Sequence, residues 1–211
     1  MAKKDVITYT TPPFIAAFTQ GVFEAQDGPD GGPKKFNLTA IWTPKKFTEK
    51  DQRLWKLIRE GLEAEAQAKF KMAWTELGEA GIKTGLRKGE AKKDLEGFGP
   101  GTIFATLSSK YEPSVCDINK DDVSPADGND DLVRPGALMR AKVRIYSYAN
   151  KGKGVGLGIQ SLQVISADED KYPRLDHRTS AADDFGDDDD SLDGSYLDQA
   201  EESVGGGSDW E

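Results

Sequence analysis

Cations and aromatic rings alternate with small apolar residues over residues 137–150, ALMRAKVRIYSYAN. Successive side chains of a β-strand point to opposite faces of the sheet. If this stretch is a strand, its apolar face consists of Met139, Ala141, Val143 and Ile145. Its other face presents Leu138 and then three cations and two rings: Arg140, Lys142, Arg144, Tyr146 and Tyr148.

This second face has the chemistry of a binding site for single-stranded nucleic acid. Cations neutralise backbone phosphates, and flat rings stack on unpaired bases whatever their sequence. The alternative is an ordinary half-exposed strand, whose solvent face often carries Lys, Arg and Tyr.

Further cations and rings lie in segments that would extend this face. Residues 83–94, KTGLRKGEAKKD, form a basic loop with two glycines, which predicts phosphate contacts by Arg87 and Lys88 or, alternatively, a solvated loop. Lys153 lies in a second basic loop, after residue 150. Trp42 and Phe104 are secondary candidates for stacking on bases, and burial in the core is the equal alternative for both.

Glycines recur at alternate positions of the next expected strand, in GKGVGLG at residues 152–158. The spacing GxxxxGK followed by Ser or Thr is absent, and Ile159 occupies the third glycine position of a dinucleotide fingerprint. Glycines within strands often mark the close approach of a ligand or of another backbone. We therefore expect Gly156 and Gly158 to leave a flat floor for a base.

The residues that most catalytic and metal sites need are scarce. His177 is the only histidine and Cys116 the only cysteine, so a His-dependent triad and a zinc site both lack partners. Residues 117–128 begin like a calcium loop, DxNxD, but lack its glycine and its bidentate glutamate. We expect no enzyme activity, no metal and no cofactor.

The sequence also contains no expected membrane or export segment. No run approaches the roughly 18 apolar residues of a membrane span, and the first residues, MAKK, lack the apolar segment of a secretory signal. A single cysteine permits no internal disulfide, which suits a reducing cytosol.

Charge is divided unevenly along the 211 residues. Residues 179–211 contain 12 acidic and no basic residues, whereas residues 1–178 contain 28 Lys and Arg against 25 Asp and Glu. A mildly basic body with a strongly acidic tail indicates a nucleic-acid partner or a partner for the tail. The tail is poor in apolar residues, a composition typical of disorder.

Hydrophobic periodicity predicts several short strands and one helix. We expect strands at residues 36–43, 102–110, 137–150 and 155–165, with a hairpin between the last two, and a bent strand with a glycine kink at residues 14–24. An apolar stripe from Leu54 to Leu77, after an N-cap at Thr48, predicts an amphipathic helix that Gly78 ends. The best fit is a mainly β fold, an OB-fold-like antiparallel barrel with one inserted helix at residues 1–170, followed by a flexible acidic tail at residues 171–211.

Four stretches in a fixed order suggest a family: AIWTPKK at residues 40–46, KTGLRKGEAKKD at 83–94, IFATLSSK at 103–110 and RPGALMRAKVRIYSYANKGKGVGLGIQSLQVI at 134–165. From residue 14 to about residue 168, the chain resembles a tailed-phage family of OB-fold single-stranded-DNA-binding proteins, formerly a domain of unknown function. The resemblance implies an accessory of replication or recombination that coats exposed single strands.

The acidic tail carries a second, looser resemblance. Its last residues, GGGSDWE, resemble the acidic segments with a near-terminal aromatic that bacterial and phage single-strand binders carry, although Trp210 is next to last rather than last. This implies docking of phage or host replication proteins by Asp209, Trp210 and Glu211. An acidic tail can also occupy the protein's own cationic groove as a mimic of DNA, and a merely solubilising appendage is the alternative.

We therefore expect sequence-tolerant binding of single-stranded DNA in the cytoplasm of a bacterial host, without catalysis. The expected phosphate contacts are Arg140, Lys142, Arg144, Lys153, Arg87 and Lys88, and Tyr146 and Tyr148 would stack on bases. The rival from another class is a protein-interaction adaptor that binds no nucleic acid. A weaker rival is a nuclease-like enzyme that uses carboxylates and magnesium.

Overall fold

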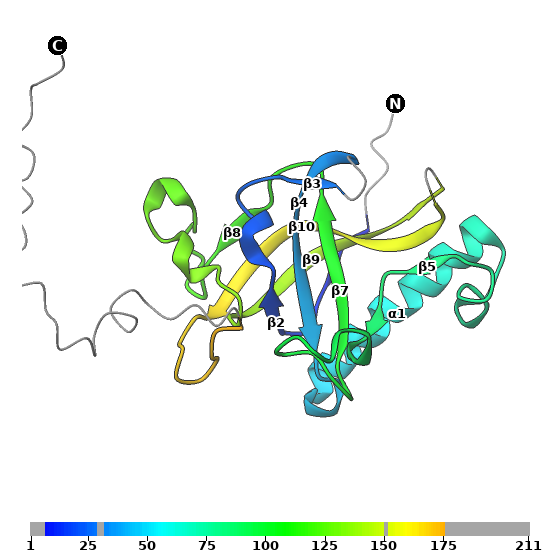
Figure 1. The fold of residues 1–211 in the computed structure, drawn as a ribbon, viewed down its shortest axis with the longest axis horizontal. Helices are drawn as coiled ribbons and strands as arrows, with labels where there is room; N and C mark the ends of the chain where they lie inside the picture. Colours follow the sequence, from blue (N-terminus) through cyan, green and yellow to red (C-terminus); the bar gives the residue numbers. More distant parts are fainter. Residues whose placement is uncertain (1–6, 29–31, 150–151, 176–211) are drawn as a thin grey trace, which may run out of the picture. The chain divides into compact units, whose positions relative to one another are not determined.

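A computed structural model describes residues 7–28, 32–149 and 152–175 of the chain (Figure 1). Within these residues the fold is mainly β with one α-helix. Five strands form a closed ring in the order β2 (Phe14–Ala17), β4 (Gly32–Trp42), β7 (Ile103–Ser109), β10 (Gly154–Ser166) and β9 (Leu138–Tyr148), and β9 pairs again with β2. The contact between β7 and β10 is parallel and the other four are antiparallel. This ring is the OB-fold-like barrel that the sequence predicts.

Short strands extend the barrel at its edges. They are β1 (Tyr9–Thr10) beside β9, β3 (Gln26–Gly28) beside β4, β5 (Lys83–Thr84) and β8 (Ser114–Cys116) beside β10, and β6 (Arg87–Lys88) beside β7. Single 3₁₀ turns lie in the connections: η1 (Thr19–Gly21), η3 (Pro44–Lys46), η4 (Trp74–Glu76), η5 (Gly89–Lys92), η6 (Pro125–Asp127) and η7 (Asp130–Leu132).

The alternation of side chains along β9 and its neighbours follows the prediction. Met139, Ala141 and Val143 are buried inside the barrel, whereas Arg140, Lys142 and Arg144 are exposed outside it. The other barrel strands contribute the rest of the core in the same alternation, through Phe14, Ala16, Leu38, Ala40, Trp42, Ala105, Leu107, Val155, Leu157 and Ile159. The barrel core is therefore apolar, and every second strand residue faces outward.

The helix α1 (Glu49–Phe70) packs on the barrel through Trp55, Ile58, Leu62 and Ala66. A reciprocal capping box begins it, because the Thr48 hydroxyl accepts from the Asp51 N–H while the Asp51 carboxylate accepts from the Thr48 N–H. The expected extension to Leu77 is wrong: Lys71 adopts a left-handed conformation with φ 60° and ends the helix. Leu77 is still fully buried, because the segment after the helix folds back onto the same core.

Two other expectations need correction. The bent strand at residues 14–24 ends at Ala17, since Phe18 has φ 51° and η1 follows, so the bend lies at Phe18 rather than at Gly21. The basic loop at residues 83–94 contains β5, β6 and η5, which fix its path along β10 and β7.

Residues 171–175, which the sequence places in the acidic tail, lie against the barrel. Arg134 is 5% exposed and donates from Nη2 to the carbonyl oxygens of Ala167 and Tyr172, both at 2.8 Å. Leu175 packs on the outer side of the barrel with Ile41. The division of the chain at residue 170 stays a prediction, but the packed structure continues to Leu175. No helix of the described residues is long and apolar enough to cross a membrane.

Candidate nucleic-acid interface

The outward face of β9 lies over the glycines of β10. Tyr146 pairs with Gly156 and Arg144 with Gly158 in the antiparallel register. A Cβ atom placed on Gly156 would lie 3.0 Å from Cζ of Tyr146, and one on Gly158 would lie 3.1 Å from Cγ of Arg144. The flat floor expected at these glycines exists, but the side chains of β9 cover it, which corrects the expectation of an open place for a base.

The two tyrosines form one aromatic surface. The ring centroids of Tyr146 and Tyr148 are 6.1 Å apart, with the planes tilted by 41°, and both side chains are half-buried. The hydroxyl oxygens of Tyr146 and Ser108 are 3.4 Å apart, so the Tyr146 ring reaches across β10 to β7. Burial, and then the neighbouring Tyr146, raise the pKa of the Tyr148 hydroxyl. Both rings are thus held at the surface by packing.

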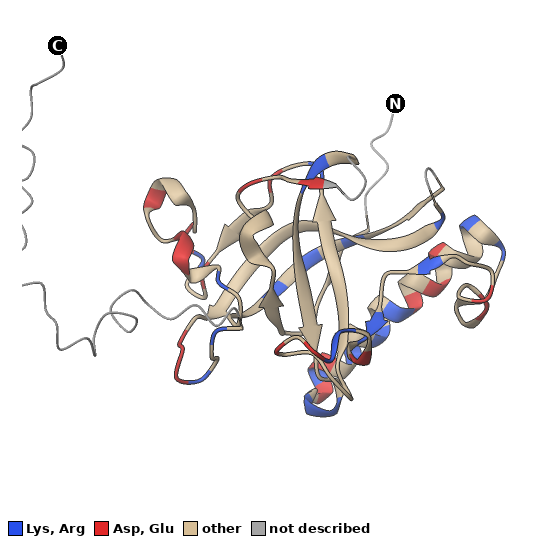
Figure 2. Ribbon diagram, in the orientation of Figure 1, with Lys and Arg blue, Asp and Glu red and all other residues tan. Residues whose placement is uncertain are grey.

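Three exposed cations continue from the tyrosines along β9, where Figure 2 shows the basic segments of that strand. They differ in their surroundings. Arg140 donates from Nε to the Gln163 side-chain oxygen at 2.6 Å, and with Lys142 it lines a groove of about 470 Å³ that also contains Asp122. Arg144 lies over Gly158, beside the tyrosines, which makes it the β9 cation best placed to bind a phosphate next to a stacked base.

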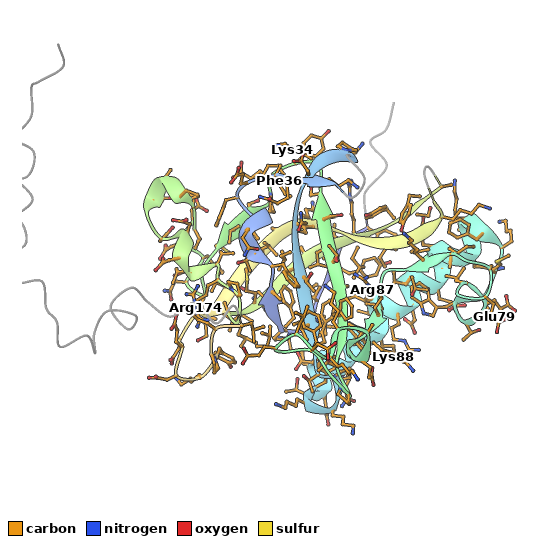
Figure 3. All side chains as sticks on the ribbon, viewed as in Figure 1. Lys34, Phe36, Glu79, Arg87, Lys88 and Arg174 are labelled. Carbon is orange, nitrogen blue, oxygen red and sulfur yellow. The ribbon has the colours of Figure 1, made fainter. Side chains whose placement is uncertain are left out.

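Arg87 comes to the same face from β6, as Figure 3 shows beside β7. Its guanidinium lies 4.6 Å from the centroid of Phe104, and its Nη2 donates to the Thr106 hydroxyl at 3.3 Å. Lys88 and Lys153 are exposed as well. Arg87 also lies near enough to Tyr148 for its charge to act on the pKa of that hydroxyl. Phosphate contact by this loop stays a prediction.

Trp42 and Phe104 are both buried, so of the two alternatives left open for them the structure selects the core. Trp42 is 1% exposed inside the barrel, and its indole N–H donates to the Pro12 carbonyl oxygen at 3.2 Å. Phe104 points outward but is 0% exposed, because the ring of Phe98 and the guanidinium of Arg87 cover it. Neither residue presents a ring face to a base.

A second aromatic group, which the sequence analysis does not include, lies on the outer side of β7. Phe18 and Phe98 have ring centroids 6.3 Å apart, and Phe98 meets the buried Phe104 edge-on at 5.1 Å. The ammonium of Lys92 lies 4.6 Å from the centroid of Phe18 and 5.5 Å from that of Phe98. Burial, and then the positive charge of Arg87, lower the pKa of Lys92.

The sequence around Phe18 and Lys92 does not distinguish either residue as part of a binding site. Phe18 lies within an apolar run, and Lys92 is one of several cations in its loop. Phe98 is flanked by glycines in GFGPG, a pattern of an exposed aromatic that points to this group. Phe18 is 43% exposed and so offers a ring edge or face to solvent.

The described residues contain no cluster of three or more His, Cys, Asp or Glu side chains that could hold a metal ion. Asp209, Trp210 and Glu211, the residues expected to dock partners, lie outside the described residues. The candidate site is therefore a surface of rings and cations that spans β6, β7, β10 and β9.

Comparisons with known proteins find similarity to proteins of bacteriophages. The protein family described as "Enterobacter phage Enc34, ssDNA-binding protein" matches residues 14–195. A curated protein, p50 of Acyrthosiphon pisum secondary endosymbiont phage 1, is 34% identical over 78 residues, which are 37% of this chain. The chain spans 40% of the length of that curated relative.

Two solved structures of the single-stranded DNA-binding protein from bacteriophage Enc34 share the fold. The one in complex with ssDNA has a TM-score of 0.63 at 15% identity and covers 77% of this chain and 88% of that chain. A C-terminal truncation of the same protein has a TM-score of 0.63 at 16% identity and covers 77% of this chain and 87% of that chain. At such identities the similarity establishes the fold alone.

Proposed function

The chain belongs to the family of the Enterobacter phage Enc34 ssDNA-binding protein, and from this premise we propose that it binds single-stranded DNA on the outer face of β9, without sequence preference and without catalysis. A solved structure with the same fold is a complex with ssDNA. The observation that carries the proposal is the pair of tyrosine rings fixed over the glycines of β10, with Arg144 and Arg87 at their edges.

Base stacking and the neutralisation of phosphate charge would both contribute to the binding free energy. Tyr146 and Tyr148 stack on successive bases, which contributes about 1–3 kcal/mol for each ring and tolerates any base. Arg144, Lys142, Arg87, Lys88 and Lys153 neutralise phosphates. Arg140 contributes less, because its guanidinium is held by Gln163 and lies in a groove with Asp122.

The acidic tail would compete with DNA and dock replication or recombination proteins in the cytoplasm of the bacterial host. Leu175 supports the first part of this proposal, because it packs with Phe98 and Ile41 on the outer side of the barrel. In the sequence, 13 acidic residues follow Leu175. Asp209, Trp210 and Glu211 remain the proposed partner-binding residues.

Fluorescence anisotropy of a labelled oligonucleotide tests the binding. We expect the chain to bind single strands of any composition more tightly than the matching duplex. Replacing both Tyr146 and Tyr148 by Ala should weaken binding to all compositions alike, whereas replacing both by Phe, which keeps the rings, should leave it near the original value. Absence of binding to either oligonucleotide at low salt would contradict the proposal and favour the protein-interaction adaptor.

A further inference from the structure

Phe18 has a backbone conformation that its residue type disfavours. Its φ of 51° and ψ of 54° lie in the left-handed region, which is an outlier for a bulky residue. Such strained conformations are concentrated at sites that bind ligands. The ring is nevertheless 43% exposed, so packing in the core does not account for the conformation. A ligand that covers the ring would account for it.

Phe98 lies beside this ring on a loop whose glycines fix its position. Gly97 and Gly99, on either side of it, have φ values of 80° and 146°, which side chains rarely allow. The Phe98 ring packs edge-on against the buried Phe104 at 5.1 Å, and its centroid is 6.3 Å from that of Phe18. Phe18 and Phe98 together thus form a fixed aromatic surface, the phenylalanine platform.

Two cations lie on the rings in and beneath this platform. The Lys92 ammonium is 4.6 and 5.5 Å from the two ring centroids of the platform, and the Arg87 guanidinium (Figure 3) is 4.6 Å from that of Phe104. Burial, and then the charge of Arg87, lower the pKa of Lys92. The two cations therefore repel each other, and an anion bound between them would relieve the repulsion.

Outward-facing residues of β7 connect the phenylalanine platform to the tyrosine pair, Tyr146 and Tyr148. Phe104 carries the platform, and the Ser108 hydroxyl lies 3.4 Å from that of Tyr146. Thr106, which lies between them on β7, is small, polar and exposed. Four residues of a strand extend about 13 Å, and stacked nucleotides advance about 3.4 Å each. A few nucleotides would therefore reach from one ring group to the other.

We propose that the phenylalanine platform stacks on bases of the same DNA strand as the tyrosine pair, and that Arg87 and Lys92 bind phosphates between the two. The inference rests on the proposed DNA binding and deepens it, because it turns the path of the strand across β7. The ligand is a polyanion with flat groups between its charges, which matches rings that alternate with cations. An acidic peptide with aliphatic side chains lacks flat groups to stack on the rings.

Anisotropy titration at low salt with two oligodeoxythymidines, about 4 and about 12 nucleotides long, tests this path, because OB folds cover about 4–16 nucleotides. Phe18→Gly removes the ring and suits the left-handed backbone. We expect its affinity for the long strand to fall about ten-fold, and its affinity for the short strand, which the tyrosine pair binds alone, to fall less than two-fold. Phe18→Tyr keeps a ring and should recover most of the lost affinity. Urea unfolding checks that both variants are folded.

Tyr111→Gly is the matched control. It removes a ring that is 77% exposed and lies just beyond the other end of β7, and both affinities should stay unchanged. An unchanged affinity of Phe18→Gly for the long strand would overturn the inference. Equal losses for the long and the short strand, or equal losses in Phe18→Gly and Tyr111→Gly, would also overturn it, because the ring would then act through stability rather than by contact.

Photocrosslinking of the unsubstituted chain gives a second measurement, which does not depend on the folding of a variant. The long strand carries 5-iododeoxyuridine at one position at a time, and mass spectrometry identifies the residues that it labels. We expect labels on Phe18 or Phe98 at one end of the strand and on Tyr146 or Tyr148 at the other. Labels on the tyrosines alone, from every position, would overturn the inference and leave the proposed function intact. Absence of binding to both strands would overturn the proposed function and the inference with it.

Discussion

Gly156 determines where the ring of Tyr146 lies, because only a residue without a side chain lets that ring rest on the β10 backbone. Gly156→Ala would place a methyl carbon 3.0 Å from Cζ of Tyr146, so the ring must shift by a few tenths of an ångström. We expect affinity for single-stranded DNA to fall about three- to ten-fold, as part of one stacking contact is lost. Anisotropy titration measures the affinity, and urea unfolding checks that stability is kept.

Gly78→Ala is the control for this substitution, since a Cβ atom at Gly78 would meet nothing within 4 Å. Its affinity should match that of the original chain. If Gly156→Ala binds as tightly as Gly78→Ala while Tyr146→Ala binds weakly, the position of the ring does not depend on the glycine.

If bound DNA extends from the tyrosines onto the rings of Phe18 and Phe98, Lys92 beside them should make binding sensitive to alkaline pH. Its pKa lies below 10.5 because burial and Arg87 disfavour the ammonium. A bound phosphate favours the ammonium, so affinity should fall as pH rises through the pKa of Lys92. Lys92→Arg keeps its charge at alkaline pH, so its affinity should fall less as pH rises through the lowered pKa of Lys92. Parallel pH profiles of the two proteins would show that Lys92 does not contact DNA.

Only some of the residues of the site could be predicted from the sequence. The period of two along residues 138–148 placed Arg144, Tyr146 and Tyr148 on one face, because strand geometry alone fixes that relation. Trp42 and Phe104 could not be assigned, since an aromatic residue in a strand is equally suited to a core and to a surface. Phe104 is outward-facing and still buried, because the loop that carries Phe98 folds over it, which no local pattern encodes.

At the level of elements, the sequence predicted the strands and the start of α1 but not all of their ends. The Thr48 capping box marked the helix start, whereas the apolar stripe ran past the helix end at Phe70 into a segment that packs on the same core. The short strands β5 and β6 were also missed, because two-residue strands form only through their long-range partners β10 and β7. Tertiary contacts decide such elements, not propensity.

Gly61 controls how closely α1 approaches β9. A Cβ atom at Gly61 would lie 2.5 Å from Cδ1 of Ile145 and 2.7 Å from the Tyr9 hydroxyl. Alanine gains about 1 kcal/mol over glycine in helix propensity, but overpacking of a tight contact costs about 1–3 kcal/mol. We therefore expect Gly61→Ala to lower the free energy of unfolding by about 1 kcal/mol, as measured by urea denaturation. A more stable variant would mean that the helix shifts along the barrel at no cost.

At the scale of the whole molecule, the basic and acidic residues are separated along the chain. The affinity for DNA therefore has to be measured as a function of salt concentration. If DNA contacts three or four of the cations around Tyr146, log K should fall with log salt at a slope of about −2 to −3. The tail changes this balance, because its carboxylates compete with phosphates for the same cations. Its effect should therefore be largest at low ionic strength and fade as the Debye length shortens.

Deletion of residues 179–211 removes 12 acidic and no basic residues. We expect the shortened chain to bind single-stranded DNA more tightly than the full chain at low salt and equally at high salt, as measured by anisotropy over a salt series. A chain of full length in which these Asp and Glu residues are replaced by Asn and Gln separates charge from bulk, and it should behave like the deletion. Tighter binding by the deletion but not by the neutral tail would mean that the tail obstructs the site by volume. Equal affinity of all three proteins at every salt concentration would remove the competition between tail and DNA altogether.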